Sequence, residues 1–262
     1  MSNRLNIPIS PLHVRMTSPE ATDASPAPRL LAIGDIHGSF ASLEALLASV
    51  CPQSGDRIIT LGDYVDRGPR SKEVLDWLID QESKGVVLPL RGNHEIMMLD
   101  ARAGSHFLRQ WLSCGGLQVL ASFGVDRLEE IPGRYWEFLE RTRSCHVEGD
   151  YFFVHANAVP DLPLDEQPDY MLFWEFIGEP RPHRSGKTMI CGHSSQKSGI
   201  PLAFPHAVCI DTFAHGGGWL TCLEVSSSSG RYWQANEQGE TREDFLPYWR
   251  GSRREAGRAL TP

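Results

Sequence analysis

The sequence predicts an α/β fold in which the strands of a mainly parallel sheet alternate with helices. Three short apolar runs, at residues 30–33, 57–61 and 85–90, are typical of buried strands, and a glycine-containing loop follows each of them. Two segments with apolar residues at helical spacing lie between these runs. Because a strand–helix–strand order produces right-handed crossovers, we expect the helices to cover the faces of one sheet.

Two helices are expected at residues 42–50 and 71–82, where apolar side chains recur every three or four positions and therefore share one face. Ser39 precedes the first of these helices and is its expected N-cap. Residues 95–142 are also expected to be helical, although glycines and a proline interrupt the pattern.

The second half of the chain carries the remaining predicted strands. A long loop with one short helix is expected at residues 160–187, which hold several prolines, charges and aromatic residues. The late strands are expected to close a second sheet. Residues 29–262 are expected to form one domain after a flexible leader at residues 1–28. The strands of this half are predicted at residues 151–155, 188–191, 207–210, 219–225 and 231–234.

Composition and charge narrow the class of protein. The 262 residues are 41% hydrophobic and 22% charged, as in ordinary globular proteins, and the formal net charge is −8. Because phosphodiester backbones attract basic surfaces, we expect no nucleic-acid partner. No apolar stretch has the length of a signal core or a membrane span, so we expect no membrane partner and a cytoplasmic location. The six cysteines form no Cys-x-x-Cys pair and are expected to be reduced thiols.

Polar side chains occur directly after the predicted strands. In open α/β sheets, ligands bind beyond the carboxyl ends of the strands, so we expect these side chains to meet in one crevice. Carboxylate, imidazole and amide groups suit divalent ions such as manganese, iron or zinc, and two such ions can together promote phosphoryl transfer. Turn formation alone would explain the Asp and Asn residues but not the histidines at matching strand ends. The residues concerned are Asp35, His37, Asp63, Asp66, Asn93, His94, His155 and His193.

Three motifs give the sequence a specific resemblance. Residues 34–38 (GDIHG), 62–68 (GDYVDRG) and 92–95 (GNHE) match, in order, the signature motifs of the phosphoprotein phosphatase family, which belongs to the calcineurin-like metallophosphoesterases. Residues 153–156 (FVHA) and 191–194 (CGHS) resemble its last two metal-binding histidines. The resemblance, to the bacterial type, implies a four-layer α/β/β/α sandwich of two mixed sheets flanked by helices. It also implies a metal-dependent serine/threonine protein phosphatase.

The same resemblance assigns a role to each site residue. It implies two divalent metal ions, with Mn²⁺ the preferred identity and Fe or Zn as alternatives, bridged by Asp63. A metal-bridging water or hydroxide would attack in line without a phosphoenzyme. His94 would be the general acid, oriented by Asp66, and Arg67, Asn93 and His94 would contact the phosphate. The implied metal ligands are Asp35, His37 and Asp63 for the first ion, with Asp63, Asn93, His155 and His193 for the second.

The sequence departs from this family where a second phosphate-binding arginine is usual, often just after a tryptophan. Here Trp174 is followed by Glu175, and Arg181 and Arg184 in the same loop are both candidates. Ser195 replaces the second histidine of the Gly-His-x-His found in broader relatives, which favours the phosphoprotein phosphatase branch.

Three further residues have two interpretations each. Arg91 suits a structural salt bridge at least as well as a phosphate contact. Asp211 suits a turn better than it suits the support of a metal-bound histidine. His215 lies in a glycine-rich hairpin, and a contact with substrate is its alternative role.

The preferred function is hydrolysis of phosphoserine and phosphothreonine in proteins, with phosphotyrosine and small phosphoesters as further substrates. The first alternative is a symmetrical diadenosine tetraphosphatase-like nucleotide hydrolase, which shares the metal motifs and would differ in the loop at residues 160–187. The second alternative is a catalytically dead binding module, and the complete set of expected ligands argues against it. We therefore expect a monomeric phosphoric monoester hydrolase.

Overall fold

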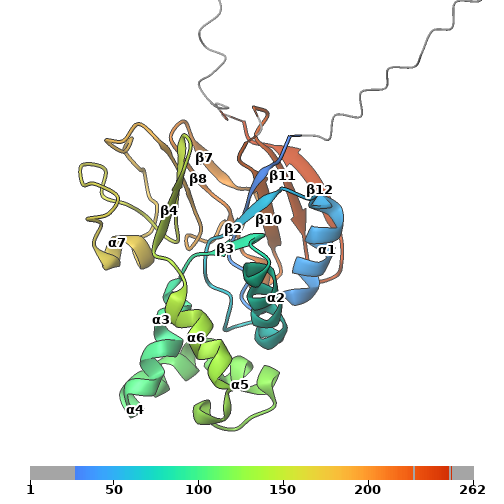
Figure 1. The fold of residues 1–262 in the computed structure, drawn as a ribbon, viewed down its shortest axis with the longest axis vertical. Helices are drawn as coiled ribbons and strands as arrows, with labels where there is room; N and C mark the ends of the chain where they lie inside the picture. Colours follow the sequence, from blue (N-terminus) through green and yellow to red (C-terminus); the bar gives the residue numbers. More distant parts are fainter. Residues whose placement is uncertain (1–26, 227, 248, 250–262) are drawn as a thin grey trace, which may run out of the picture.

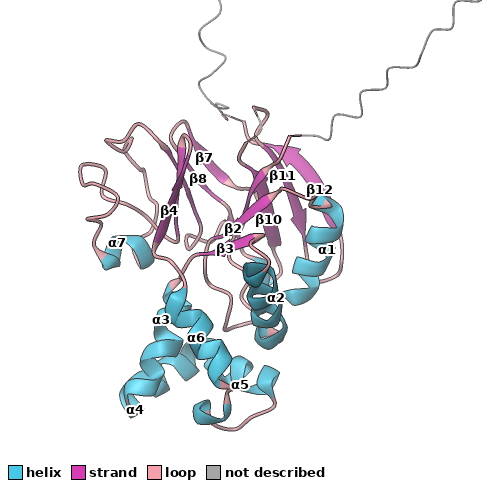
Figure 2. Ribbon diagram, in the orientation of Figure 1, coloured by secondary structure: helices cyan, strands magenta, loops and turns pink. Residues whose placement is uncertain are grey.

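The computed structural model describes residues 27–226, 228–247 and 249, and it shows two β-sheets packed face to face with helices outside them (Figures 1 and 2). This arrangement confirms the expected sandwich of two mixed sheets flanked by helices. Most of the expected leader, residues 1–26, lies outside the described residues. Within the described ranges, no helix has the length and apolar character that a membrane crossing requires.

The first sheet is built around the three parallel strands that the sequence predicts. Its strands are β1 (Leu30–Ile33), β2 (Arg57–Thr60), β3 (Val87–Pro89), β9 (Asp211–Thr212), β10 (Trp219–Glu224), β11 (Arg231–Ala235) and β12 (Thr241–Phe245). The order is β12-β11-β10-β1-β2-β3, with β9 paired to β10. β1, β2 and β3 run parallel, so their carboxyl ends and the loops that follow lie at one edge of the sheet.

The second sheet comes from the later part of the chain. Its strands are β4 (Cys145–Glu148), β5 (Tyr151–Val154), β6 (Thr188–Cys191), β7 (Leu202–Phe204) and β8 (Ala207–Cys209). The order is β4-β5-β6-β8-β7, in which β5, β6 and β8 are parallel and the two edge strands are antiparallel. β5 and β6 therefore deliver the loops after them to the same end of the sheet.

The helices fall into three groups. α1 and α2 cover the outer face of the first sheet, and α7 lies beside the second sheet (Figure 1). α3 to α6 form a helical lobe at the bottom of the view (Figure 2), and its buried side chains continue the core under α2. Their bounds are α1 (Phe40–Val50), α2 (Ser71–Ser83), α3 (Asn93–Asp100), α4 (Ser105–Trp111), α5 (Leu117–Phe123), α6 (Gly133–Arg141) and α7 (Asp169–Phe173).

Alternation along the strands divides the core into layers. In β1, Leu31 and Ile33 pack under the helices, whereas Ala32 faces the second sheet. In β5, Phe153 faces the first sheet and Phe152 faces α7. Because successive side chains of a strand point to opposite faces, strands that are buried on both faces must be apolar throughout, as these are.

Three details differ from the sequence-based expectations. β10 and β11 extend the first sheet, although the late strands were expected to close the second sheet. β12 is a strand that the sequence analysis did not predict, and all five of its side chains are exposed. Ser39 occupies the N-cap position of α1, but its side chain makes no capping hydrogen bond.

Candidate metal centre

The loops after β1 and β2 are folded tightly against each other. The backbone N–H groups of Ile36 and His37 donate to the carbonyl of Asp63, at 3.0 and 2.8 Å. His37 and Asp63 themselves adopt left-handed backbone conformations, with φ of 45° and 51°. Such conformations cost energy in residues other than glycine and often mark functional sites. Gly92 must be glycine, because a Cβ atom there would lie 2.2 Å from Asp63 Oδ1.

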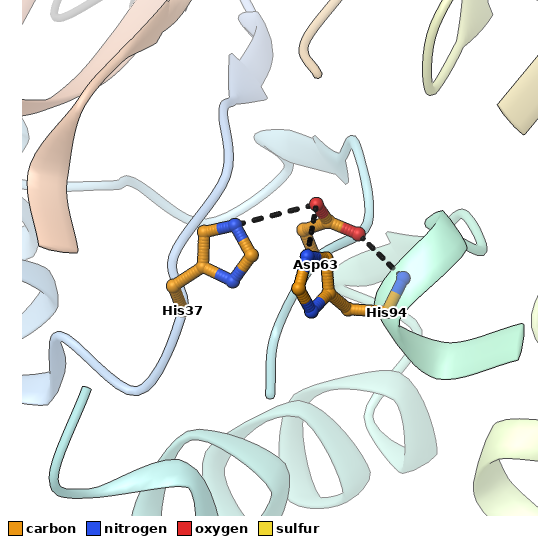
Figure 3. A group of neighbouring side chains, drawn as sticks. All are labelled: His37, Asp63 and His94. Atoms are coloured by element: carbon orange, nitrogen blue, oxygen red, sulfur yellow. Dashed lines mark hydrogen bonds and ion pairs between the residues drawn. The ribbon is translucent and has the colours of Figure 1, made fainter. Parts of the chain in front are cut away.

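The first group of metal-binding side chains consists of His37, Asp63 and His94 (Figure 3). Asp63 Oδ2 lies 3.3 Å from His37 Nε2 and 4.0 Å from His94 Nε2. The backbone N–H of His94 donates to Asp63 Oδ1 at 3.0 Å, which fixes the orientation of the carboxylate. All three side chains are buried.

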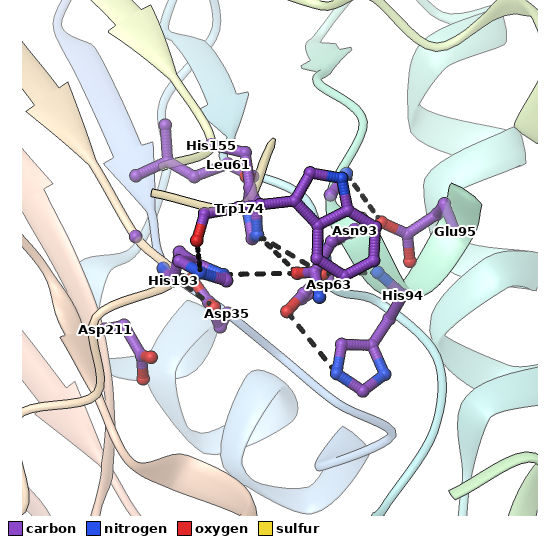
Figure 4. Close-up of polar contacts among 12 residues, drawn as sticks. Asp35, Leu61, Asp63, Asn93, His94, Glu95, His155, Trp174, His193 and Asp211 are labelled. Carbon is purple, nitrogen blue, oxygen red and sulfur yellow. Dashed lines mark hydrogen bonds and ion pairs between the residues drawn. The ribbon is translucent and has the colours of Figure 1, made fainter. Parts of the chain in front are cut away.

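The second group consists of Asp63, His155 and His193, with the Asn93 side chain between them (Figure 4). His155 Nε2 lies 3.5 Å from Asp63 Oδ1 and 3.0 Å from Asn93 Oδ1. His193 Nδ1 lies 3.2 Å from the same Asn93 oxygen. Asp63 therefore belongs to both groups, which is the arrangement expected of a bridging ligand.

The tautomers of three histidines are set by carbonyl groups behind them. His37 Nδ1 and His155 Nδ1 each lie within 2.9 Å of a backbone carbonyl, of Val65 and Leu61 respectively. His193 Nε2 lies 3.1 Å from the carbonyl of Trp174. Each carbonyl can only accept, so these ring nitrogens donate and the other nitrogen of each ring presents a lone pair to the centre.

The centre is consequently rich in acceptors and poor in donors. Asn93 Oδ1 faces the lone pairs of His155 and His193, so acceptors face acceptors. With protein groups alone, these atoms are satisfied only if the Asn93 amide is reversed, so that its N–H groups donate to Asp63 and to both rings. A cation among the same atoms satisfies all of them without that reversal. Imidazole, carboxylate and amide oxygen are the donor types that divalent transition metals accept, so these residues fit a metal ion.

The pKa values of the site also suit metal binding. Burial alone would raise the pKa of Asp63, but His155, His94 and His37 hold it well below its usual range. Burial lowers the pKa of His193 to about 4 and also lowers that of His155. Asp63 is therefore ionised and the imidazoles of His155 and His193 are neutral near pH 7, which are the protonation states that bind metals.

Asp35 lies next to the second group but belongs to neither. Its carboxylate accepts the backbone N–H of His193, at 3.0 and 3.2 Å from its two oxygens. Burial, followed by the charges of Asp211 and Asp63, raises the pKa of Asp35 well above its usual range. The structure thus places Asp35 beside the metal-binding side chains, and its role as a ligand stays a prediction.

A chain of hydrogen bonds leads from His94 into the helical lobe. His94 Nδ1 lies 2.6 Å from Asp66 Oδ2, and Trp111 Nε1 donates to the other Asp66 oxygen at 2.8 Å. Burial lowers the pKa of His94 to about 3, and burial also raises the pKa of Asp66. This geometry holds one ring nitrogen of His94 away from the site and aims the other into it.

Arg67 is a cationic side chain that hydrogen-bonds to the first metal-binding group. Its guanidinium donates to His37 Nε2 at 3.1 Å and to His94 Nε2 at 2.9 Å. It also approaches His215 Nε2 at 3.3 Å. Because the Arg67 side chain is exposed and hydrogen-bonds to both histidines of the first group, it is placed to contact an incoming phosphoryl oxygen.

Glu95 is a positioning residue to which the sequence analysis gave no role. Its buried carboxylate accepts the backbone N–H groups of Asp63, Tyr64 and Gly92, each at 2.8 Å. It thereby ties the loop after β2 to the first turn of α3. The signal was present, because a glutamate three residues after the N-cap Gly92 is the pattern of a capping box.

The structure also decides between the two interpretations of Arg91 and of Asp211. Arg91 donates to three carbonyls at the end of α6 and has a structural role. Asp211 accepts the backbone N–H of Phe213, as a turn-forming aspartate does, and also the Ser195 hydroxyl.

The guanidinium groups of Arg181 and Arg184 contact Asp161 rather than either metal-binding group, so the second phosphate-binding arginine stays unassigned. His215 packs edge-on against His37, with 4.7 Å between ring centroids.

Comparisons with known proteins agree with this picture. The family model described as calcineurin-like phosphoesterase matches residues 28–220. A symmetrical bis(5'-nucleosyl)-tetraphosphatase of Neisseria gonorrhoeae is 39% identical over 176 residues, 66% of this chain and 57% of that protein. Its counterpart from Nitrosospira multiformis is 26% identical over 140 residues, 52% of this chain and 46% of that protein. The chain thus spans about half the length of these curated relatives.

Two other comparisons concern a protein phosphatase and a solved structure. Serine/threonine-protein phosphatase 1 of Salmonella typhimurium is 43% identical over 86 residues, 32% of this chain and 37% of that protein. The crystal structure of a candidate diadenosine tetraphosphatase has a TM-score of 0.59 and 21% identity, with 83% of this chain and 93% of that chain covered. At this level of identity the structural match supports the fold alone.

Proposed function

Because this chain belongs to the calcineurin-like phosphoesterase family, we propose that it hydrolyses dinucleoside tetraphosphates symmetrically, into two nucleoside diphosphates. The sequence analysis placed this activity second, after protein phosphatase activity. The comparisons reverse that order, because the matches to symmetrical tetraphosphatases are up to about twice as long as the match to the bacterial protein phosphatase, at 176 against 86 residues. The substrate is a proposal, since those relatives are matched over about half of their length.

The observation that carries the hydrolase proposal is the position of Asp63 in two metal-binding groups at once. We assign one ion to Asp35, His37 and Asp63, and a second to Asp63, Asn93, His155 and His193. Two bound divalent ions would polarise the phosphoryl group and lower the pKa of a water molecule. Manganese remains the preferred ion, and iron or zinc fit the same donors.

The protein's own groups have separate tasks in this proposal. Arg67 binds oxygens of the attacked phosphoryl group through its forked N–H groups. His94 is the proposed proton donor to the departing oxygen: Asp66 holds the imidazole by its Nδ1 atom so that Nε2 faces the substrate, and Nε2, which accepts from Arg67 in the structure, must first gain a proton. Trp111 fixes Asp66 in turn. A nucleoside diphosphate leaves more readily than a serine alkoxide, so proton donation matters less for a dinucleotide than for a phosphoprotein.

The second candidate function is hydrolysis of phosphoserine and phosphothreonine. It is favoured by the 43% identity over 86 residues with the Salmonella phosphatase. A panel of diadenosine tetraphosphate, phosphoserine and phosphothreonine peptides, and p-nitrophenyl phosphate, each assayed with Mn²⁺, separates the two. We expect the dinucleotide to have the highest kcat/KM and to yield two molecules of ADP. A phosphopeptide kcat/KM that is about tenfold higher or more would reverse the assignment.

A further inference from the structure

The loop between β5 and β6 presents aromatic side chains to solvent beside the metal-binding groups. Tyr170, Trp174 and Phe176 are 59%, 42% and 66% exposed. Phe176 stacks on the ring of His193, with centroids 5.2 Å apart and an angle of 28° between the planes. One face of Phe176 thus covers a candidate metal ligand, while much of the side chain remains open to solvent. Clustered exposed aromatics of this kind mark binding surfaces.

The backbone around Phe176 is fixed to the same strands that carry the metal-binding histidines. Asn157, two residues after His155, donates its side-chain N–H to the carbonyl of Phe176 at 3.0 Å. Ser194, which follows His193, accepts the backbone N–H of Ile177 at 2.9 Å. Asn157 and Ser194 are both buried. Phe176 is therefore held in place before any ligand arrives, which reduces the entropy cost of binding.

A cleft of about 520 Å³ opens next to Phe176. Tyr170 and Phe176 contribute aromatic surface to it, and Met171 and Ile177 contribute apolar surface. The volume lies in the range of small-molecule sites, which are apolar and carry a few polar groups for orientation. Glu175 and Glu179 are the carboxylates of its lining.

The charges of the cleft disfavour the binding of a phosphate there. Its one cation, Arg181, is paired with Asp161 at 2.7 Å, so Glu175 and Glu179 leave the cleft negative. The substrate's phosphates are attracted instead to Arg67 and the metal ions. A neutral, flat group that carries N–H donors suits a cleft with aromatic walls and carboxylate acceptors.

We propose that this cleft binds one purine base of the substrate, stacked on Phe176, with its N–H groups directed to the carboxylates of Glu175 and Glu179. The inference rests on the proposed dinucleotide activity and assigns that substrate a base-binding subsite. The same stacking would favour purines over the smaller pyrimidines.

The test compares Phe176→Ala with Phe176→Trp on two substrates, diadenosine tetraphosphate and p-nitrophenyl phosphate. Phe176→Ala is expected to raise KM for the dinucleotide about 5- to 100-fold with little change in kcat, because one stacking contact is lost. Phe176→Trp should restore KM, and the loss in Phe176→Ala should be larger for the dinucleotide than for p-nitrophenyl phosphate. The metal content of each variant is measured because Phe176 also stacks on His193. Phe245→Ala, at a phenylalanine on β12 that is also more than half exposed, is the matched control and should behave as wild type.

The possible failures are distinguishable. Wild-type protein that cleaves phosphopeptides but not the dinucleotide refutes the proposed function and the base subsite together. Wild-type protein that cleaves the dinucleotide, with an unchanged KM in Phe176→Ala, refutes only the base subsite. Equal losses on both substrates together with reduced metal content would show that Phe176 serves only to support His193, and would also refute the base subsite.

Discussion

At the scale of single residues, the chemistry depends on how a few side chains are held. His94 has one ring nitrogen fixed by Asp66 and the other turned toward Asp63 and Arg67. It lies in the same group as His37 and Asp63, so its position suits either a proton donor or a metal ligand. Removal of the imidazole distinguishes these roles, because the metal content falls only if His94 is a ligand.

We predict that His94→Ala retains both metal ions and lowers kcat about 100- to 10,000-fold for a phosphoserine peptide. The loss should be smaller for diadenosine tetraphosphate, whose leaving group needs less protonation. Steady-state kinetics beside elemental analysis of the purified variant check both statements. Loss of one metal equivalent would instead make His94 a ligand.

We predict that Asp63→Ala loses both metal ions and all measurable turnover, because Asp63 is the one carboxylate shared by the two metal-binding groups found in the described residues. Elemental analysis after gel filtration gives the metal content. Asp126→Ala, an exposed aspartate in the helical lobe, is the control and should keep wild-type metal content. A variant at position 63 that still binds two ions would exclude a bridging role.

At the scale of elements, the loop after β2 is shaped by the start of α3. Glu95 accepts backbone N–H groups from that loop and from Gly92, so one carboxylate orients two segments that carry candidate ligands. Burial, followed by the charge of Asp63, raises the pKa of Glu95 to about 7. The sequence shows the residue but not these contacts, which depend on how β2 and α3 meet.

We predict that Glu95→Gln lowers the free energy of unfolding by about 1–3 kcal/mol, because one accepting oxygen is replaced by a donor that faces other donors. It should also weaken metal binding, because Asp63 is no longer held. Urea unfolding and metal titration measure the two effects. The control is Glu137→Gln on the exposed face of α6. Equal stability and equal metal affinity of the two variants would contradict the positioning role of Glu95.

A second contact between elements joins the starts of β1 and β2. Asp56 accepts hydrogen bonds from the backbone and side chain of Arg29 and from the backbone of Gln53. Burial alone would raise the pKa of Asp56, but these hydrogen bonds outweigh burial and lower it. The ionised form therefore stabilises the fold above the unfolded-state pKa of about 4, and this contribution is lost as the pH falls through the folded-state pKa.

We predict that Asp56→Asn lowers the free energy of unfolding by about 1–3 kcal/mol at neutral pH, because charge-assisted hydrogen bonds are lost. The difference from wild type should narrow as the pH falls below about 4. Urea unfolding across this pH range measures it. A difference that stays constant with pH would show that the charge of Asp56 is irrelevant.

Elements that are marked by a local apolar pattern could be predicted from the sequence, whereas pairings between distant segments could not. β1, β2 and β3 were predictable because each is a local apolar run, and their parallel order follows from the helices between them. β12 was missed because Thr241–Phe245 shows no apolar alternation, all of its side chains being exposed. The sheet to which β10 belongs was mistaken, since its pairing with β1 joins distant parts of the chain and leaves no local pattern.

In the candidate site, too, positions set by strand ends could be predicted, and positions set by the packing of the two sheets could not. The approach of His37 to Asp63 and that of His155 to His193 could be anticipated, because each lies at a strand end of a parallel sheet. The position of Asp35 against the backbone of His193 could not, because it depends on how the two sheets pack.

At the scale of the whole molecule, the candidate metal centre draws its side chains from both sheets. His155 belongs to the second sheet, yet its Nδ1 donates to the carbonyl of Leu61 in the first. His193 follows β6 of the second sheet and meets Asn93 from the start of α3. A ligand that binds this assembled centre and not the unfolded chain stabilises the whole fold.

We predict that saturating Mn²⁺ stabilises the protein by about 2.7 kcal/mol at a 100-fold excess over Kd, which raises Tm by about 5–10 °C for a chain of this size. A chelator should reverse the shift. Differential scanning calorimetry measures it, with Asp63→Ala as the variant that should not respond. An equal shift in that variant would place the stabilising ion elsewhere.

The sharing of Asp63 between groups drawn from both sheets also constrains the order of folding. His37, Asp63 and Asn93 are synthesised well before His155 and His193, so a nascent chain holds only part of the donor set until the second sheet exists. Contacts between distant parts of the chain form late, because loop closure must precede them. In the proposed two-ion centre, capture of the second ion would therefore mark the completion of folding, and a chain interrupted within the helical lobe would carry the motifs without the centre.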